Sequence, residues 1–69
     1  MMTEIIFMIE ESLEGGFVAR AIGQSIVTEA ETLESLKEMI RDAVKCHFET
    51  DQLPRIIRLH FVKEEILAV

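Results

Sequence analysis

Only one segment of this chain has the length and apolar spacing of an amphipathic helix, and this constrains the fold more than any other feature. Within residues 33–49 the apolar positions recur at steps of three and four, which predicts one buried stripe. These positions are Leu33, Leu36, Ile40, Ala43, Val44 and Phe48. Thr32 is a candidate N-cap, and Thr28 with Glu31 forms a competing capping box. One helix covers one face of a sheet, so a sheet in this chain keeps a second face uncovered.

The first part of the chain is typical of two strands joined by a tight turn. Residues 4–10 form an apolar run rich in β-branched and aromatic side chains, which predicts a central strand buried on both faces. Gly15 and Gly16 predict a hairpin turn with positive φ at one or both glycines. Residues 17–21 are then the second strand of the hairpin.

The remaining elements complete a β-β-β-α-β order. Residues 25–28 are predicted as a short third strand, and Pro54 ends the helix because the residue before a proline is driven out of helical geometry. Residues 55–63 alternate as the last strand, and residues 64–69 form a tail with no assigned structure. The predicted fold class for residues 1–69 is a single small α+β domain, with an antiparallel-rich sheet and one helix on one face.

The size of the chain favours self-association. A chain of 69 residues buries only a small core, and such a core rarely supplies more than about 3–5 kcal/mol of net stability. Cys46 is the only cysteine, so no disulfide within the chain adds to this stability. A homodimer or higher oligomer is therefore expected.

Charge and hydropathy narrow the range of other partners. The net charge of −6 repels phosphate backbones and attracts basic proteins, so no direct nucleic-acid binding is expected. No apolar run approaches the roughly 18–20 residues that span a bilayer, so no membrane partner is expected. A free thiol and an N-terminus without the features of a signal peptide together predict a cytoplasmic protein.

Few residues indicate chemistry. Cys46 and His47 are neighbours on the predicted helix and point about 100° apart, so they do not form a nucleophile–base pair. His60 lies in mid-strand without a predicted acidic partner, and the acidic residues show no spacing typical of a metal site. The sequence therefore predicts no catalytic residues, no metal and no cofactor, and a small enzyme or nuclease is the third-ranked alternative.

The sheet face without the helix is the candidate binding surface. Ile57, Leu59 and Phe61 of the last strand are assigned to the helix side, because side chains alternate between the two faces of a strand. The opposite face mixes apolar side chains with arginine and histidine, a composition typical of interfaces. The predicted oligomer or partner interface comprises Val18, Arg20, Ile56, Arg58, His60 and Val62. The alternative is an ordinary half-solvated sheet face.

The order of short motifs resembles the HicB-like antitoxin domain over about residues 4–64. The first motif, Glu-Gly-Gly-Phe-Val-Ala at residues 14–19, follows a strand, and Glu-Thr-Leu-Glu-Ser-Leu at residues 31–36 opens the amphipathic helix. The ending Leu-Pro-Arg-Ile-Ile-Arg-Leu-His-Phe at residues 53–61 is similar to the short solo branch of the same superfamily.

The resemblance implies a partial ribonuclease H-like fold without its catalytic carboxylates. It also implies oligomerisation and a role as the antitoxin of a type II toxin–antitoxin system, which neutralises a HicA-type mRNA-cleaving toxin, a small basic protein. Two features differ from many members: residues 21–25 replace a proline-containing segment, and no C-terminal DNA-binding domain is seen. The alternative is a solo oligomeric HicB-like domain that binds another protein.

Overall fold

The structure is a computed structural model of the chain, and it describes residues 3–63 and 65–69. The expectation about an export signal rests partly on Met1 and Met2, and the predicted tail begins at Glu64. These three residues lie outside the described part of the chain.

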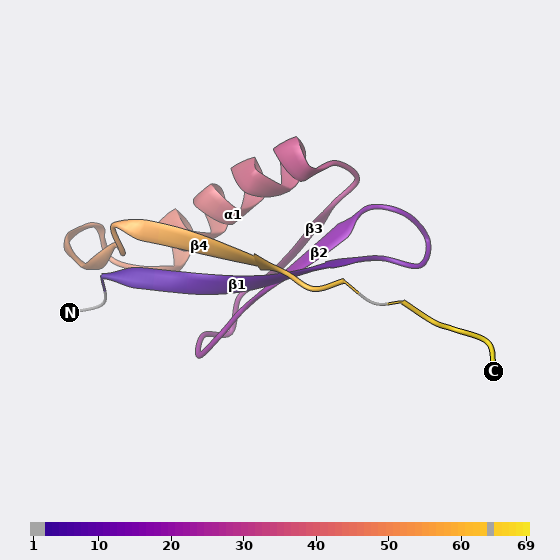
Figure 1. Ribbon diagram of the computed structural model, residues 1–69. Helices are drawn as coiled ribbons and strands as arrows, with labels where there is room; N and C mark the ends of the chain where they lie inside the picture. Colours follow the sequence, from indigo (N-terminus) through magenta and orange to yellow (C-terminus); the bar gives the residue numbers. More distant parts are fainter. Residues whose placement is uncertain (1–2, 64) are drawn as a thin grey trace.

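The described residues form a four-stranded mixed sheet with one helix on one face, which confirms the predicted α+β class and the β-β-β-α-β order (Figure 1). The sheet order is β3-β2-β1-β4; β1, β2 and β3 pair antiparallel, and β4 runs parallel to β1. The elements are β1 (Glu4–Glu11), β2 (Phe17–Ala21), β3 (Val27–Ala30), α1 (Leu33–His47), a 3₁₀ turn η1 (Thr50–Gln52) and β4 (Ile56–Phe61).

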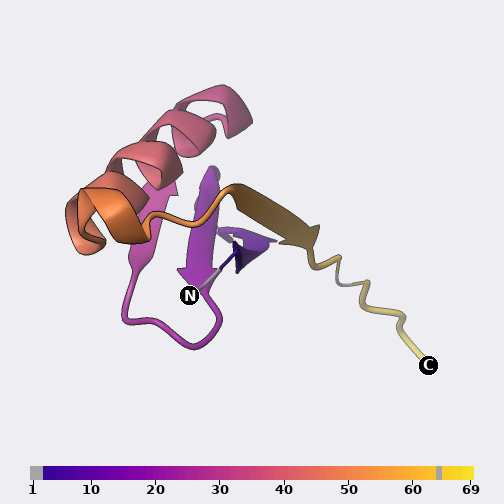
Figure 2. The ribbon, with the colours of Figure 1, turned by 90° about the vertical axis from the view of Figure 1, so that its left-hand side faces the viewer.

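Strand β1 lies in the middle of the sheet, but it is fully buried on one face only. Ile5, Phe7 and Ile9 point toward α1 and are buried, whereas Ile6 and Met8 point to the other face and are half-buried. The prediction of burial on both faces was therefore wrong. The physical reason is that α1, the single α-helix of the described residues, lies on only one side of β1 (Figure 2).

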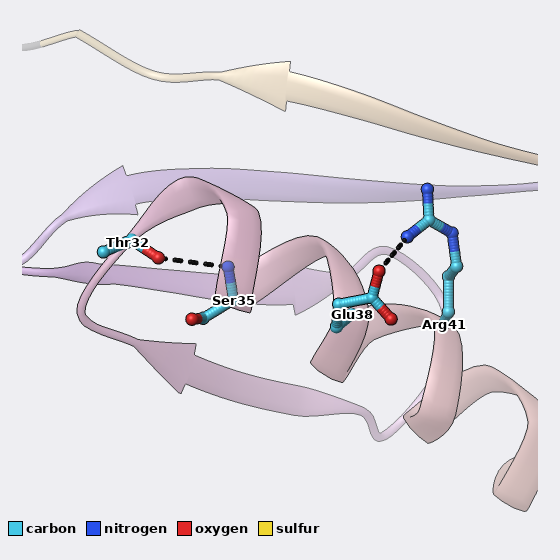
Figure 3. A network of polar contacts seen from close by, with 4 residues as sticks. All are labelled: Thr32, Ser35, Glu38 and Arg41. Atoms are coloured by element: carbon cyan, nitrogen blue, oxygen red, sulfur yellow. Dashed lines mark hydrogen bonds and ion pairs between the residues drawn. The ribbon is translucent and has the colours of Figure 1, made fainter.

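Helix α1 begins at the predicted cap and buries the predicted stripe. The Thr32 hydroxyl accepts a hydrogen bond from the Ser35 amide N–H at 3.1 Å (Figure 3), while Thr28 of the competing capping box lies in β3. The helix ends at His47, two residues earlier than predicted, because Phe48 takes an extended conformation with φ −107° and ψ 150°. The buried helix residues are Leu36, Ile40 and Val44, and Leu33, Ala43 and Phe48 pack against the same core.

The two turns before β3 show which predicted strand boundaries are correct and which are not. Gly15 and Gly16 have φ values of +96° and +84°, which confirms the predicted hairpin turn. The third strand begins at Val27 instead of Ser25, because Gly23, at φ +83°, opens a wider turn that runs on through Ser25. The turn is closed by a 3.0 Å hydrogen bond from the Ala21 amide to the carbonyl of the buried Ile26.

Helix α1 contacts β3 and β2 more extensively than β4, so the helix side of β4 is incompletely covered. Ile57 and Leu59 are half-buried there, as predicted, but Phe61 on the same face is 58% exposed, so its assignment to the core was wrong. Strand β4 is also shorter than the predicted residues 55–63. Between α1 and β4 lies a shallow hollow of about 100 Å³, lined by Lys37, Ile40, Arg41, Ile57 and Leu59.

Candidate protein interface on the open sheet face

We define the open face as the side of the sheet that points away from α1. The strand register places the predicted interface residues there together. In the hairpin, Val18 pairs with Glu10 and Arg20 with Met8. On the other side of β1, Ile56, Arg58 and His60 pair with Glu4, Ile6 and Met8, and so point the same way.

Val62 extends this arrangement just beyond the end of β4. Its amide N–H donates to the Ile9 carbonyl at 2.8 Å, so the backbone still follows β1 at this point. Because Val62 is two residues beyond His60, its side chain lies on the open face as well. The structure therefore brings the six predicted residues to one surface.

The register also identifies open-face residues that sequence reasoning did not assign. Ile6 and Met8 lie between the two groups of predicted residues and are only half-buried, so they form the apolar centre of the open face. The additional residues around this centre are Glu4, Glu10, Val27 and Glu29. The signal that finds them is the hairpin register, since placing Met8 opposite Arg20 assigns every second residue of β1 to this face.

Several apolar side chains on the open face are exposed well beyond what a folded interior leaves accessible. Val27 is 61% exposed, Ile56 52% and Val62 42%. Exposed apolar side chains interleaved with charged groups are typical of a protein-binding surface.

The charged groups of the open face carry both signs. The Arg58 guanidinium donates a hydrogen bond to the Glu4 carboxylate at 2.9 Å, with the two side chains 52% and 37% exposed. An exposed pair of this kind contributes at most about 1 kcal/mol to stability. Arg20 lies diagonally across from Glu10 of β1 and Glu29 of β3, both of which pair with Val18, two residues before Arg20. A surface with both signs side by side can complement a second copy of itself across a two-fold axis.

The cysteine and the two histidines considered for chemistry lie on two different elements, α1 and β4. Cys46 is exposed on α1, and the neighbouring His47 ring contacts Gln24 Oε1 at 3.1 Å and packs edge-on against Phe48 at 4.9 Å. His60 lies on the open face opposite Met8. In the described residues, no three His, Cys, Asp or Glu side chains come together in a group that could hold a metal ion.

We expect Cys46→Ala to leave both the melting temperature and the sedimentation coefficient of the protein unchanged. The thiol is exposed, so its removal creates no cavity and takes away little buried apolar area. Thermal unfolding and sedimentation of the variant beside the parent protein test this. A loss of assembly with the melting curve intact would assign Cys46 a role at an interface instead.

Two proteins, each from a different organism, are clearly similar to this chain. A UPF0150 protein of Archaeoglobus fulgidus is 52% identical over 52 residues, which cover 75% of this chain and 77% of that protein. A UPF0150 protein of Thermotoga maritima is 44% identical over 66 residues, covering 96% of this chain and 93% of the relative. No family model and no solved structure matches the chain. None of the helices in the described part of the chain has the length and apolar character that crossing a bilayer requires.

Proposed function

We propose that this chain, which belongs to the UPF0150 family, is a non-catalytic binding module that associates with itself and with a protein partner. The observation that carries this proposal is the open face. Its apolar centre, Ile6 and Met8, is flanked by exposed Ile56 and Val62 and bordered by charges of both signs.

The energetics of a small chain support self-association through this face. Burying exposed apolar area stabilises a complex by about 25 cal/mol per Å² before the entropic costs of association. A small chain buries a smaller fraction of its surface when it folds alone, so burial at an interface is a larger share of its total stabilisation. The arginines then fix the orientation of the two copies, because charged groups contribute more to specificity than to affinity.

The finer form of the proposal is an antitoxin that binds and neutralises a HicA-type mRNA-cleaving toxin in the cytoplasm. Two observations support it: the ordered motifs that resemble the HicB-like domain, and the net charge of −6, which favours association with a small basic protein. A neighbouring reading frame for such a basic protein is the first thing to seek. If that protein is made and does not bind this chain, the alternative of a solo module with a different protein partner takes its place.

The open-face interface is tested by Ile56→Asp. We expect the variant to weaken self-association by at least about 1–2 kcal/mol, because it places an unpaired carboxylate in a contact from which water is excluded, and next to Glu4. Sedimentation velocity across a dilution series measures the change.

Met39→Asp is the matched control for this experiment. Met39 is an apolar side chain 44% exposed on α1, whereas Ile56 is 52% exposed on the open face. The control should assemble as the parent does. If Met39→Asp dissociates the protein and Ile56→Asp does not, the interface lies on the helix side of the sheet.

A further inference from the structure

The segment that follows β4 is an exposed, extended arm. Figures 1 and 2 show residues 65–69 beyond the end of β4, running away from the body of the domain. Ile66 is 86% exposed, Leu67 85% and Val69 131%. Three large apolar side chains thus stand within four consecutive positions. Their free energy is lowered only when another surface covers them and removes them from water.

The outer edge of β4 offers unpaired backbone groups. The amides of Ile56 and Val62 donate inward, to the carbonyls of Thr3 at 3.2 Å and Ile9 at 2.8 Å. Backbone groups of alternate residues point in opposite directions, so those of Ile57 and Leu59 point outward. In the described part of the chain no strand lies on that side of β4. Such an edge is a template for one more strand.

The hollow beside this edge matches the chemistry of the arm. Ile40, Ile57 and Leu59 give it an apolar lining, while Lys37 and Arg41 place two positive charges on its helix side. Arg41 is already paired with Glu38 at 2.9 Å (Figure 3). A strand laid along β4 would direct alternate side chains into the hollow.

The arm has the alternation that this geometry requires. Leu67 and Val69 are two residues apart and share one face of an extended strand, together with the acidic Glu65. Two apolar side chains would therefore meet the lining formed by Ile57 and Leu59. The carboxylate of Glu65 would come near the basic side of the hollow.

We propose that residues 65–69 of one copy add as an extra strand to the outer edge of β4 in a second copy, with Leu67 and Val69 in the hollow beside α1. The donor is a second copy because the arm points away from its own domain, and its return to its own β4 edge would need a reversal directly after the strand (Figure 2). Two copies can exchange arms reciprocally, which buries Leu67 and Val69 of both arms and pairs both edges. This inference uses a different surface from the open face and does not depend on it.

The first test is the full chain carrying both Leu67→Lys and Val69→Lys. We expect the dissociation constant of the assembly, measured by sedimentation velocity, to rise at least about 100-fold, because two ammonium groups would enter an apolar lining that Lys37 and Arg41 already border with positive charge. Leu13→Lys is the matched control, since Leu13 is 106% exposed in the β1–β2 turn, and it should change the constant by less than about threefold. Equal effects of the arm variant and the control would overturn the proposal.

The second test separates exchange from folding back. One chain carries Lys37→Cys and a second carries Leu67→Cys, both with Cys46→Ser, and the two are mixed under oxidising conditions. We expect a covalent dimer containing one copy of each on a denaturing, non-reducing gel. The same result is expected when both chains also carry Ile56→Asp, since that side chain lies on the open face and does not line the hollow. A third chain carries Lys37→Cys and Leu67→Cys together. The proposal would be overturned if this chain formed only an internal disulfide, or if the mixture of the two single-cysteine chains formed no disulfide.

Discussion

Phe7→Ala is expected to leave most of the protein unfolded at 25 °C. Phe7 is 0% exposed at the centre of β1, between Ala21 of β2 and Leu59 of β4. Replacing a buried phenylalanine by alanine typically costs about 3–5 kcal/mol, from lost transfer free energy and from the cavity left behind. A core of this size supplies about the same amount in total. Far-UV circular dichroism with a urea titration measures the loss.

Phe61→Ala is the control for this experiment, since Phe61 lies on the same face of the sheet but is 58% exposed. It should lower the free energy of unfolding by less than about 1 kcal/mol, as surface substitutions do. A Phe7→Ala variant as stable as Phe61→Ala would show that the core is organised around other side chains.

Gly16→Ala is expected to destabilise the hairpin by about 2–4 kcal/mol, from a positive φ and a steric clash together. At φ +84° an added Cβ would lie 2.7 Å from the Ala30 carbonyl oxygen and 3.3 Å from the Glu31 Cα. Both atoms belong to the backbone at the end of β3, so the clash is relieved only by moving that strand.

Gly15→Ala separates the two contributions. Gly15 has φ +96°, but an added Cβ would meet nothing within 4 Å. Only the backbone strain of about 1–2 kcal/mol remains, so this variant should be clearly more stable than Gly16→Ala. Paired thermal melts decide the matter, and equal losses at the two positions would rule out the contact with Ala30 as the main cause.

The elements with a strong local signal could be predicted from the sequence. The apolar stripe from Leu33 to Phe48 identifies α1, and the Gly15-Gly16 pair identifies the first turn, because both depend on neighbouring residues alone. The third strand was misplaced by two residues because Gly23 opens a wider turn than its neighbours indicate.

Packing between elements was harder to predict. Phe61 was assigned to the core by alternation, which gives the correct face but not the coverage of that face. Coverage depends on where α1 lies across the sheet, and no local pattern encodes its position over β2 and β3. In the same way, the six candidate interface residues could be placed on one face, but Ile6 and Met8 between them required the register of the hairpin.

The parallel pairing of β1 with β4 has a consequence for how the chain folds. The two strands are joined through the hairpin, β3 and α1, so their pairing closes a loop of about fifty residues, from Glu4 to Ile56. Contacts of such sequence separation are reached late, since the entropy of closing the loop is lost before any of them stabilises the chain. Until then one edge of β1 is available to other chains. The last strand therefore both completes the fold and covers this edge of β1 in the newly made protein.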